Sequence, residues 1–146
     1  MSTLAIDIND ANLIVADDTG VLATEPGYAV VGRDGVLTGK AAYAQARLRP
    51  RETSNRFWQE LSLEENSSGL DGVANTAQLA FAQLESLWTR FGGAGHDAVL
   101  VVPDHYSREQ LGLLLGLAVE CGMPVRSLVN SAVAASPRPY PGQQLI

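Results

Sequence analysis

The stretch AVLVVPDHYSREQLGLLLGLAVECGMPVRSLV, residues 98–129, decides the fold class of this chain. It opens on an uninterrupted apolar run over residues 98–102 that ends at Pro103, which is typical of a strand buried on both faces. A second strand is expected over residues 125–129, directly after Pro124. The stretch therefore predicts two strands separated by one long connection.

The connection between these strands has the pattern of a helix. Ser107 precedes Gln110 by the spacing of a capping box, and Gly122 is a fitting helix stop. The apolar positions between them share one predicted face: Leu111, Leu114, Leu115, Ala118 and Val119. Gly112 and Gly116, also on one face, predict close packing of this helix on the sheet. Two strands joined in this way are expected to run parallel, with a right-handed crossover.

The N-terminal part of the chain has short alternating segments and tight turns. Residues 4–8 and 12–16 are expected to be strands around the turn Asn9-Asp10-Ala11, and further strands are expected over 21–24 and 28–31. These segments predict an antiparallel meander. The fold class is therefore mixed α/β, with the meander and the parallel βαβ unit in one mixed sheet and helices packed on it.

Two more helices are expected in the middle of the chain. Residues 40–48 are rich in alanine and end before Pro50, while Asn75 or Thr76 can cap a longer helix that Gly92 stops. The apolar residues of the longer helix share one face: Leu79, Leu84, Leu87, Trp88 and Phe91. Residues 64–72 are polar and are predicted to form a loop.

The composition limits the class of protein. The chain has 146 residues, 46% of them apolar, and Cys121 is its one cysteine, so a single domain without an intramolecular disulfide is expected. The net charge of −6 argues against a nucleic acid partner, because phosphate binding depends on clustered Lys and Arg. No apolar run is long enough to cross a membrane and no secretory signal is recognisable, so we expect a cytoplasmic protein without a membrane partner.

The charge is distributed unevenly along the chain. Residues 33–56 have a local balance of +4, so the remainder carries −10. Their basic residues are Arg33, Lys40, Arg47, Arg49, Arg51 and Arg56, against the acidic residues Asp34 and Glu52. Such a segment is either a solvated surface or a surface that faces a partner.

Four segments, in this order and spacing, carry a family resemblance. They are the strand pair at 4–8 and 12–16, the segment LTGKAA at 37–42 with Arg49-Pro50, the strand end VLVVPDHY at 99–106, and the segment GMPVRSLVNSAVAA at 122–135. Together they resemble the first lobe of the actin-like ATPases, and within that superfamily the heat shock 70 (DnaK-type) chaperones. The resemblance implies a ribonuclease H-like fold. It also implies a site for ATP and magnesium between the two lobes of a full-length parent.

The resemblance places a phosphate loop at the turn after Asp7. In the family this turn is Gly-Thr-Thr, because glycine lets backbone N–H groups approach the phosphate. Here the turn is Asn9-Asp10-Ala11-Asn12, so the glycine is missing and Asp10 adds a negative charge where phosphate oxygens would lie. By the same resemblance Asp7 would hold a magnesium ion through water. The alternative is that the Asp7 carboxylate caps the turn.

Two further family positions are altered. The catalytic lysine that follows the phenylalanine matched by Phe57 is replaced by Gln59 or Glu60, and Lys40 is the only lysine in the chain. The glutamate of the family's Asn-Glu-Pro segment is replaced by Ser131. Since neither Gln59 nor Glu60 can neutralise developing phosphoryl charge, the catalytic apparatus is expected to be degraded.

No other group of residues predicts an active site. His96 and His105 are expected to be solvated loop residues. Cys121, near a helix C-terminus, is expected to be an inert thiol, because the negative end of the helix dipole raises its pKa.

Two functions remain open at this point. The first is the nucleotide-binding lobe of a divergent DnaK-type chaperone-like protein over residues 1–136, with an inserted subdomain at about 33–66 and residues 137–146 as a tail or the start of a truncated strand. Such a fragment would need the remainder of its parent chain to complete the site, would itself bind no ATP, and would self-associate through exposed edges. The second is a non-catalytic pseudo-ATPase scaffold or interaction module that uses the segment 33–56 as its contact.

Overall fold

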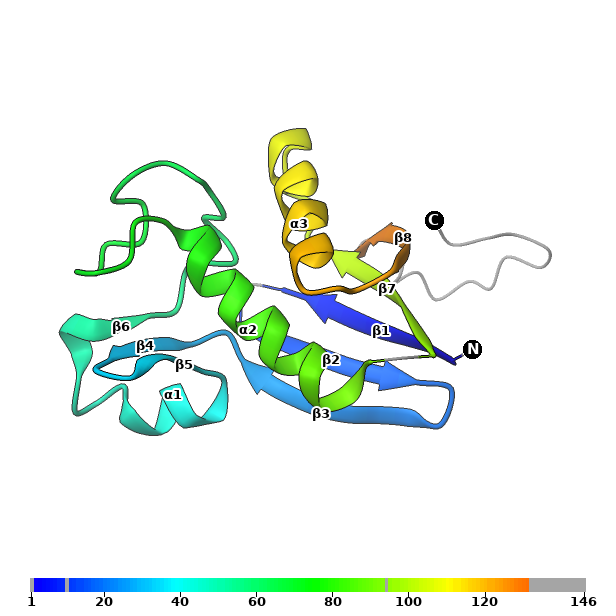
Figure 1. Ribbon diagram of the computed structural model, residues 1–146, viewed down its shortest axis with the longest axis horizontal. Helices are drawn as coiled ribbons and strands as arrows, with labels where there is room; N and C mark the ends of the chain where they lie inside the picture. The colour runs from blue at the N-terminus through cyan, green and yellow to red at the C-terminus, as the bar shows by residue number, and fades with distance from the viewer. Residues whose placement is uncertain (1, 10, 94, 132–146) are drawn as a thin grey trace.

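The computed structural model describes residues 2–9, 11–93 and 95–131 (Figure 1). In chain order the elements are β1 (Ser2–Ile8), β2 (Asn12–Asp17), β3 (Gly20–Pro26), β4 (Ala29–Gly32), β5 (Gly35–Thr38), α1 (Lys40–Gln45), the 3-10 helix η1 (Pro50–Glu52), β6 (Thr53–Ser54), α2 (Thr76–Phe91), β7 (His96–Val102), α3 (Arg108–Glu120) and β8 (Val125–Asn130). The end of the lobe expected over residues 1–136 and the tail expected at 137–146 lie outside the described residues. Among the described helices, none is both long enough and apolar enough to span a membrane.

The main sheet has five strands in the order β3-β2-β1-β7-β8. The pairs β1–β2 and β2–β3 are antiparallel, whereas β1–β7 and β7–β8 are parallel. The meander and the βαβ unit therefore share one mixed sheet, and the expected fold class is confirmed. Parallel pairing also brings the carboxyl ends of β1, β7 and β8 to the same edge of the sheet.

The core lies between one face of this sheet and the helices α2 and α3. In Figure 1, α2 crosses in front of the sheet and α3 lies beside it, on the side of β7 and β8. Every second residue of β1 points into this layer, and Leu4, Ile6 and Ile8 are fully buried there. The helices contribute fully buried leucine side chains to the same core: Leu79, Leu84 and Leu87 from α2, and Leu114 from α3. The alternating set of Thr3, Ala5 and Asp7 lies on the other face and is only half-buried.

One expected strand does not belong to the meander. β4 leaves the main sheet and pairs with β5 and β6 in a separate three-stranded sheet, with α1 packed beside it. The pairing of β3 with β2 ends at Pro26, which has no N–H to donate to a neighbouring strand. Gly27 follows at the bend. The strand β5 was not expected, because its four residues are too few for a periodic signal.

The expected packing of α3 is partly wrong. Leu114 and Ala118 are buried as expected, but Val119 is 75% exposed. Gly112 and Gly116 are exposed as well, and a Cβ atom added at either would meet open space. The glycines therefore face solvent and do not pack on the sheet.

A buried polar cluster joins the two sheets, and no sequence pattern predicted it. Gln83 of α2 is fully buried, accepts a hydrogen bond from the indole N–H of Trp58 at 2.8 Å, and donates to Glu25 Oε1 at 3.2 Å. The buried Glu25 carboxylate also pairs with Arg90 and lies directly against Gly39, which precedes α1. This cluster ties the end of β3, helix α2 and the small sheet into one unit.

Candidate functional site

The candidate site lies at the carboxyl ends of the three parallel strands. Asp7 is in register with Val101, and Val102 with Asn130, so β1, β7 and β8 all end at the same edge. Ligands of open α/β sheets bind outside this edge. The candidate residues Asn9, Asn12 and Ser131 all lie there, with Asp7 one residue before the end of β1.

Asp7 is the only acidic candidate that the structure describes at this edge. Its side chain lies on the sheet face away from the helices, between the register partners Ile14 and Val101. Burial raises the pKa of the Asp7 carboxyl. Within the described residues its carboxylate has no hydrogen-bond donor and no cationic partner. It is therefore a carboxylate that is available to a ligand.

The turn between β1 and β2 is closed by the side chain of Asn9. The amide oxygen of Asn9 accepts hydrogen bonds from the backbone N–H groups of Ala11 at 3.1 Å and of Asn12 at 2.9 Å. The Asn9 backbone N–H donates in turn to the carbonyl of Asn12 at 3.1 Å. The turn is thus capped by Asn9 and not by Asp7. Asp10 lies outside the described residues, so its expected effect on phosphate stays a prediction.

This capping uses the backbone groups that a phosphate loop needs. A phosphate loop binds through N–H groups that point to the ligand without a partner of their own. Here two N–H groups of the turn, those of Ala11 and Asn12, already donate to the side-chain oxygen of Asn9. The described part of the turn therefore has its donors satisfied from within the chain.

The helix that follows β7 is closed in the same way. The Ser107 hydroxyl accepts from the Gln110 N–H at 3.1 Å, and the Ser107 N–H donates to Gln110 Oε1 at 2.9 Å. The expected capping box is therefore confirmed. A free helix N-terminus attracts anions, and the capping box occupies two of the donors at this one, the N–H groups of Ser107 and Gln110.

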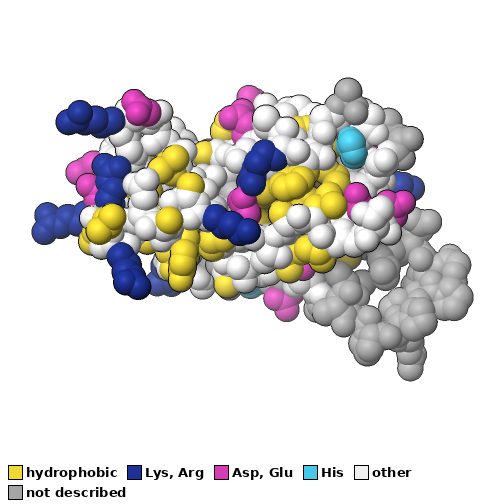
Figure 2. All heavy atoms as spheres, turned by 90° about the horizontal axis from the view of Figure 1, so that it is seen from below, with side chains coloured by type: hydrophobic (Ala, Val, Ile, Leu, Met, Phe, Trp, Pro, Cys, Tyr) yellow, Lys and Arg dark blue, Asp and Glu magenta, His cyan; other side chains and the backbone are white. Residues whose placement is uncertain are grey.

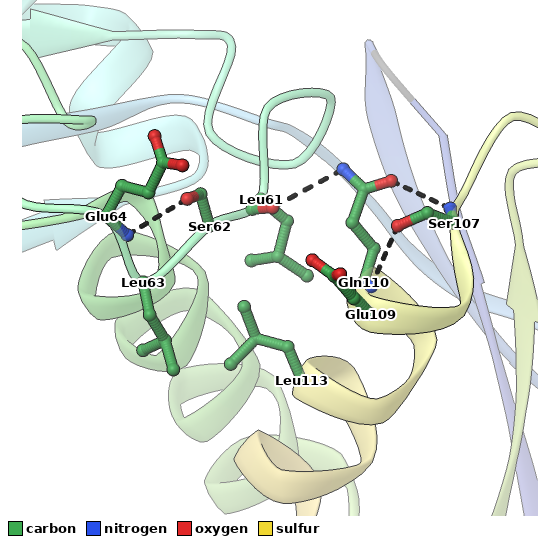
Figure 3. A pocket seen from close by; sticks show the side chains of 8 residues that line it. All are labelled: Leu61, Ser62, Leu63, Glu64, Ser107, Glu109, Gln110 and Leu113. Carbon is green, nitrogen blue, oxygen red and sulfur yellow. Dashed lines mark hydrogen bonds between the residues drawn. The ribbon is translucent and has the colours of Figure 1, made fainter.

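A pocket of about 410 Å³ lies beside this helix start (Figure 3). Its walls are the loop at 61–64 and the first turns of α3, and Gln110 joins them by donating to the Leu61 carbonyl at 3.4 Å. Figure 3 shows Glu64 and Glu109 on the two walls, so the pocket carries carboxylates and no cation. It does not suit a phosphate.

The segment that the resemblance matches to the family's catalytic lysine makes other contacts in this structure. Phe57 and Trp58 are buried in the core, while Gln59 and Glu60 are exposed. Glu60 pairs with Arg56 at 3.3 Å. Lys40 begins α1, which belongs to the small sheet. Within the part of the chain that the structure describes, no lysine reaches the candidate edge.

Ser131 is not in contact with Asp7. It directly follows β8, and β7 separates β8 from β1, so the two positions are roughly 10 Å apart at the usual interstrand spacing. A ligand would have to bridge them. Asn130, just before Ser131, is half-buried at the same edge.

The two histidines and Cys121 do not form a catalytic or metal site among the described residues. His105 is exposed as expected, whereas the expectation for His96 is wrong, since it is the first residue of β7 and its Nδ1 is buried without a hydrogen-bond partner. Burial, together with Glu85 and Glu120, raises the pKa of Cys121 to about 11, so its thiol stays protonated and unreactive at neutral pH. No three His, Cys, Asp or Glu side chains come together as a metal site among the described residues.

Comparison with known proteins supports the fold and goes no further. No protein-family model and no curated protein sequence matches this chain. Among solved structures, it is similar to the crystal structure of MreB5 of Spiroplasma citri bound to ADP, with a TM-score of 0.65 and 18% sequence identity. The match covers 90% of this chain and 39% of MreB5. The chain therefore has the fold of an actin-like ATPase lobe, and it spans well under half of the length of that protein.

Proposed function

We propose that this chain is a nucleotide-binding-type lobe, related to the DnaK-type chaperones, that has lost nucleotide chemistry and acts as a protein-binding scaffold. The observation that carries this proposal is the turn at Asn9, whose side-chain oxygen holds the N–H groups of Ala11 and Asn12. The DnaK-type assignment rests on the four sequence segments and their order. The actin-like fold agrees with it without distinguishing it from other members of the superfamily.

The closed turn lowers phosphate affinity for a simple reason. A phosphate that binds Ala11 and Asn12 must first displace the Asn9 oxygen, which is held next to them by the backbone. Two such hydrogen bonds are worth roughly 2 kcal/mol, or about a thirtyfold loss in affinity. The lack of a lysine beside the edge removes the usual compensating charge.

A second candidate function is nucleotide binding without hydrolysis. Asp7 favours it, because its unpartnered carboxylate lies at the edge where nucleotides bind in this class of fold. Magnesium is commonly held by one or two carboxylates together with substrate phosphates, and Asp7 is the residue that would hold it through water. The ADP bound to MreB5 is in keeping with this candidate.

Titration calorimetry with Mg-ATP separates the two functions. For the unaltered chain we expect no saturable heat up to millimolar Mg-ATP. In the variant Asn9→Gly the two N–H groups lose their internal acceptor, and weak, measurable binding is expected. Micromolar affinity of the unaltered chain would contradict the scaffold proposal and support the second candidate.

A further inference from the structure

Helix α1 and the turn after it form an unusually exposed apolar surface. We define the Tyr43–Leu48 surface as the groove of about 500 Å³ lined by Tyr28, Tyr43, Ala44, Ala46, Arg47 and Leu48. The side chain of Leu48 is 84% exposed and that of Tyr43 is 60% exposed. A leucine this open gains nothing for the fold, because it buries almost no area.

One wall of this groove is rigid. The rings of Tyr28 and Tyr43 meet edge to face, with centroids 5.1 Å apart and planes at 80°. Tyr28 is half-buried between the two sheets, and its carbonyl accepts a hydrogen bond from the Gly39 N–H at 3.0 Å. The aromatic wall is therefore already in place before any partner arrives, which lowers the entropic cost of binding.

The cation that lines this groove, Arg47, is unused within the chain. Among the described residues, its side chain takes part in no ion pair or hydrogen bond, and the same holds for Arg33 and Arg51 of the same basic segment; all three are exposed. Arg56 and Arg90 differ, since Arg56 pairs with Glu60 and Arg90 with Glu25. Figure 2 shows several Lys and Arg side chains at the end of the molecule that holds the small sheet, with apolar and a few acidic side chains among them, and fewer cations along the rest of this face.

We propose that the Tyr43–Leu48 surface binds an acidic peptide segment that carries apolar side chains. A carboxylate of such a segment would meet the free guanidinium group of Arg47, and its apolar side chains would cover Tyr43 and Leu48. Arginine with an aromatic neighbour is the composition enriched at protein interfaces. A nucleic acid would use the cations but leave Leu48 uncovered, and the chain as a whole carries −6.

This inference names the partner class for the scaffold of the proposed function and rests on it. The two can still fail separately, because the Asn9 turn lies in the main sheet and the Tyr43–Leu48 surface lies on the small sheet. Calorimetry with Mg-ATP tests the first alone. Peptide binding tests the second alone.

Fluorescence anisotropy with labelled peptides tests the inference on the full chain. The probe is a short peptide in which Glu and Asp alternate with Leu and Phe, and its companion has Ser in place of Leu and Phe. The variants are Arg47→Glu and Leu48→Ser, both at surface positions. The matched control is Arg108→Glu, which makes the same charge change at the exposed start of α3.

We expect the acidic apolar peptide to bind saturably and to weaken with added salt. Arg47→Glu and Leu48→Ser should each weaken binding roughly tenfold, while Arg108→Glu leaves it unchanged. The serine companion should bind at least tenfold more weakly. No saturable binding of the acidic apolar peptide, or equal binding by Arg47→Glu and Arg108→Glu, would overturn the inference. Tighter binding of a single-stranded oligothymidine, of phosphatidylserine vesicles or of a second copy of the chain, lost in Arg47→Glu, would also overturn it in favour of that partner.

Discussion

The turn at Asn9 and the Tyr43–Leu48 surface differ in what their donors are bonded to. At the turn, the N–H groups of Ala11 and Asn12 are held by the Asn9 side chain. On the Tyr43–Leu48 surface, the side chain of Arg47 has no partner among the described residues. An anion that reaches the sheet edge must compete with internal hydrogen bonds, whereas one that reaches α1 meets free cations.

Under the proposed function, this chain has kept the fold without the nucleotide chemistry. The actin-like sheet still brings three carboxyl strand ends together, as nucleotide sites of this class require. At that edge the side chains of Asn9, Ser107 and Gln110 are engaged in hydrogen bonds within the chain, while Asp7 has no partner among the described residues. The protein-binding surface that we propose lies on the small sheet instead.

The largest effect on the free energy of unfolding is expected at Gly39, where the small sheet lies against the Glu25 carboxylate of the main sheet. Gly39 has φ +69°, and a Cβ atom there would collide with the buried Glu25 carboxylate. We expect Gly39→Ala to lower the free energy of unfolding by about 3 kcal/mol, measured by urea denaturation. The control Gly112→Ala, in an open helical position, should instead raise it by roughly 0.5–1 kcal/mol. Equal changes in the free energy of unfolding for Gly39→Ala and Gly112→Ala would show that the contact between Gly39 and Glu25 does not hold the two sheets together.

A smaller loss is expected at the capped edge. Ser107→Ala removes the acceptor for the Gln110 N–H and should cost about 1 kcal/mol of unfolding free energy in the same assay. Ser2→Ala, the same substitution at the exposed first residue of β1, should be neutral. If Ser107→Ala is also neutral, the donors at the edge are not a source of stability, and the contrast with the Tyr43–Leu48 surface is lost.

The two turns that flank β2 predict different responses to pH. The Thr19 side chain and backbone N–H donate to the Asp17 carboxylate and lower its pKa, whereas the Asn9 turn has a neutral acceptor. Thr19→Ala should raise the pKa of Asp17 toward its usual value, measured by NMR titration of the carboxyl carbon.

The sign of the stability change follows from that shift. A carboxyl with a lowered pKa in the folded state contributes stability above its unfolded pKa and loses it as the pH falls through the folded pKa. The unaltered chain should therefore have a higher Tm than Thr19→Ala at neutral pH, and this difference in Tm should become smaller as the pH falls into the acid range. A difference that widens in acid would contradict this assignment.

The smallest effect on the free energy of unfolding is expected for the unpaired arginines of the basic segment at 33–56. Because Arg33, Arg47 and Arg51 have no partners among the described residues, replacing all three by alanine should change the free energy of unfolding by less than about 0.5 kcal/mol. Asn9→Ala, which removes two hydrogen bonds, should cost about 2 kcal/mol. A large loss in the arginine variant would mean that these cations serve the fold.

Local sequence patterns predicted the parts of the fold that depend on neighbours in the chain. The apolar run before Pro103 and the spacing of Ser107 and Gln110 were sufficient for β7 and the start of α3. The small sheet was missed because β5 and β6 are too short to show a period. The packing of Gly112 was wrong because helical spacing does not say which face meets the sheet.

The predicted strands at 4–8 and 12–16 put Asp7, Asn9 and Asn12 at the carboxyl end of β1, and the structure confirms these strands. That these residues correspond to a phosphate loop stays a prediction. That Asn9 caps the turn was missed, although an asparagine that bonds the backbone two residues on is a known turn signal. The buried Gln83 had one signal as well, a polar residue beside Leu79 and Leu84 on the apolar face of α2, but its partners Glu25 and Trp58 lie too far along the chain to be paired from sequence.

An NMR titration of the labelled full chain with Mg-ATP tests the central claim most directly, because it observes the backbone amides of Ala11 and Asn12 themselves. The closed turn predicts that these two resonances stay in place up to millimolar Mg-ATP in the unaltered chain and move in Asn9→Gly. Saturable shifts of both amides in the unaltered chain, with a micromolar midpoint, would contradict the claim and restore the nucleotide site.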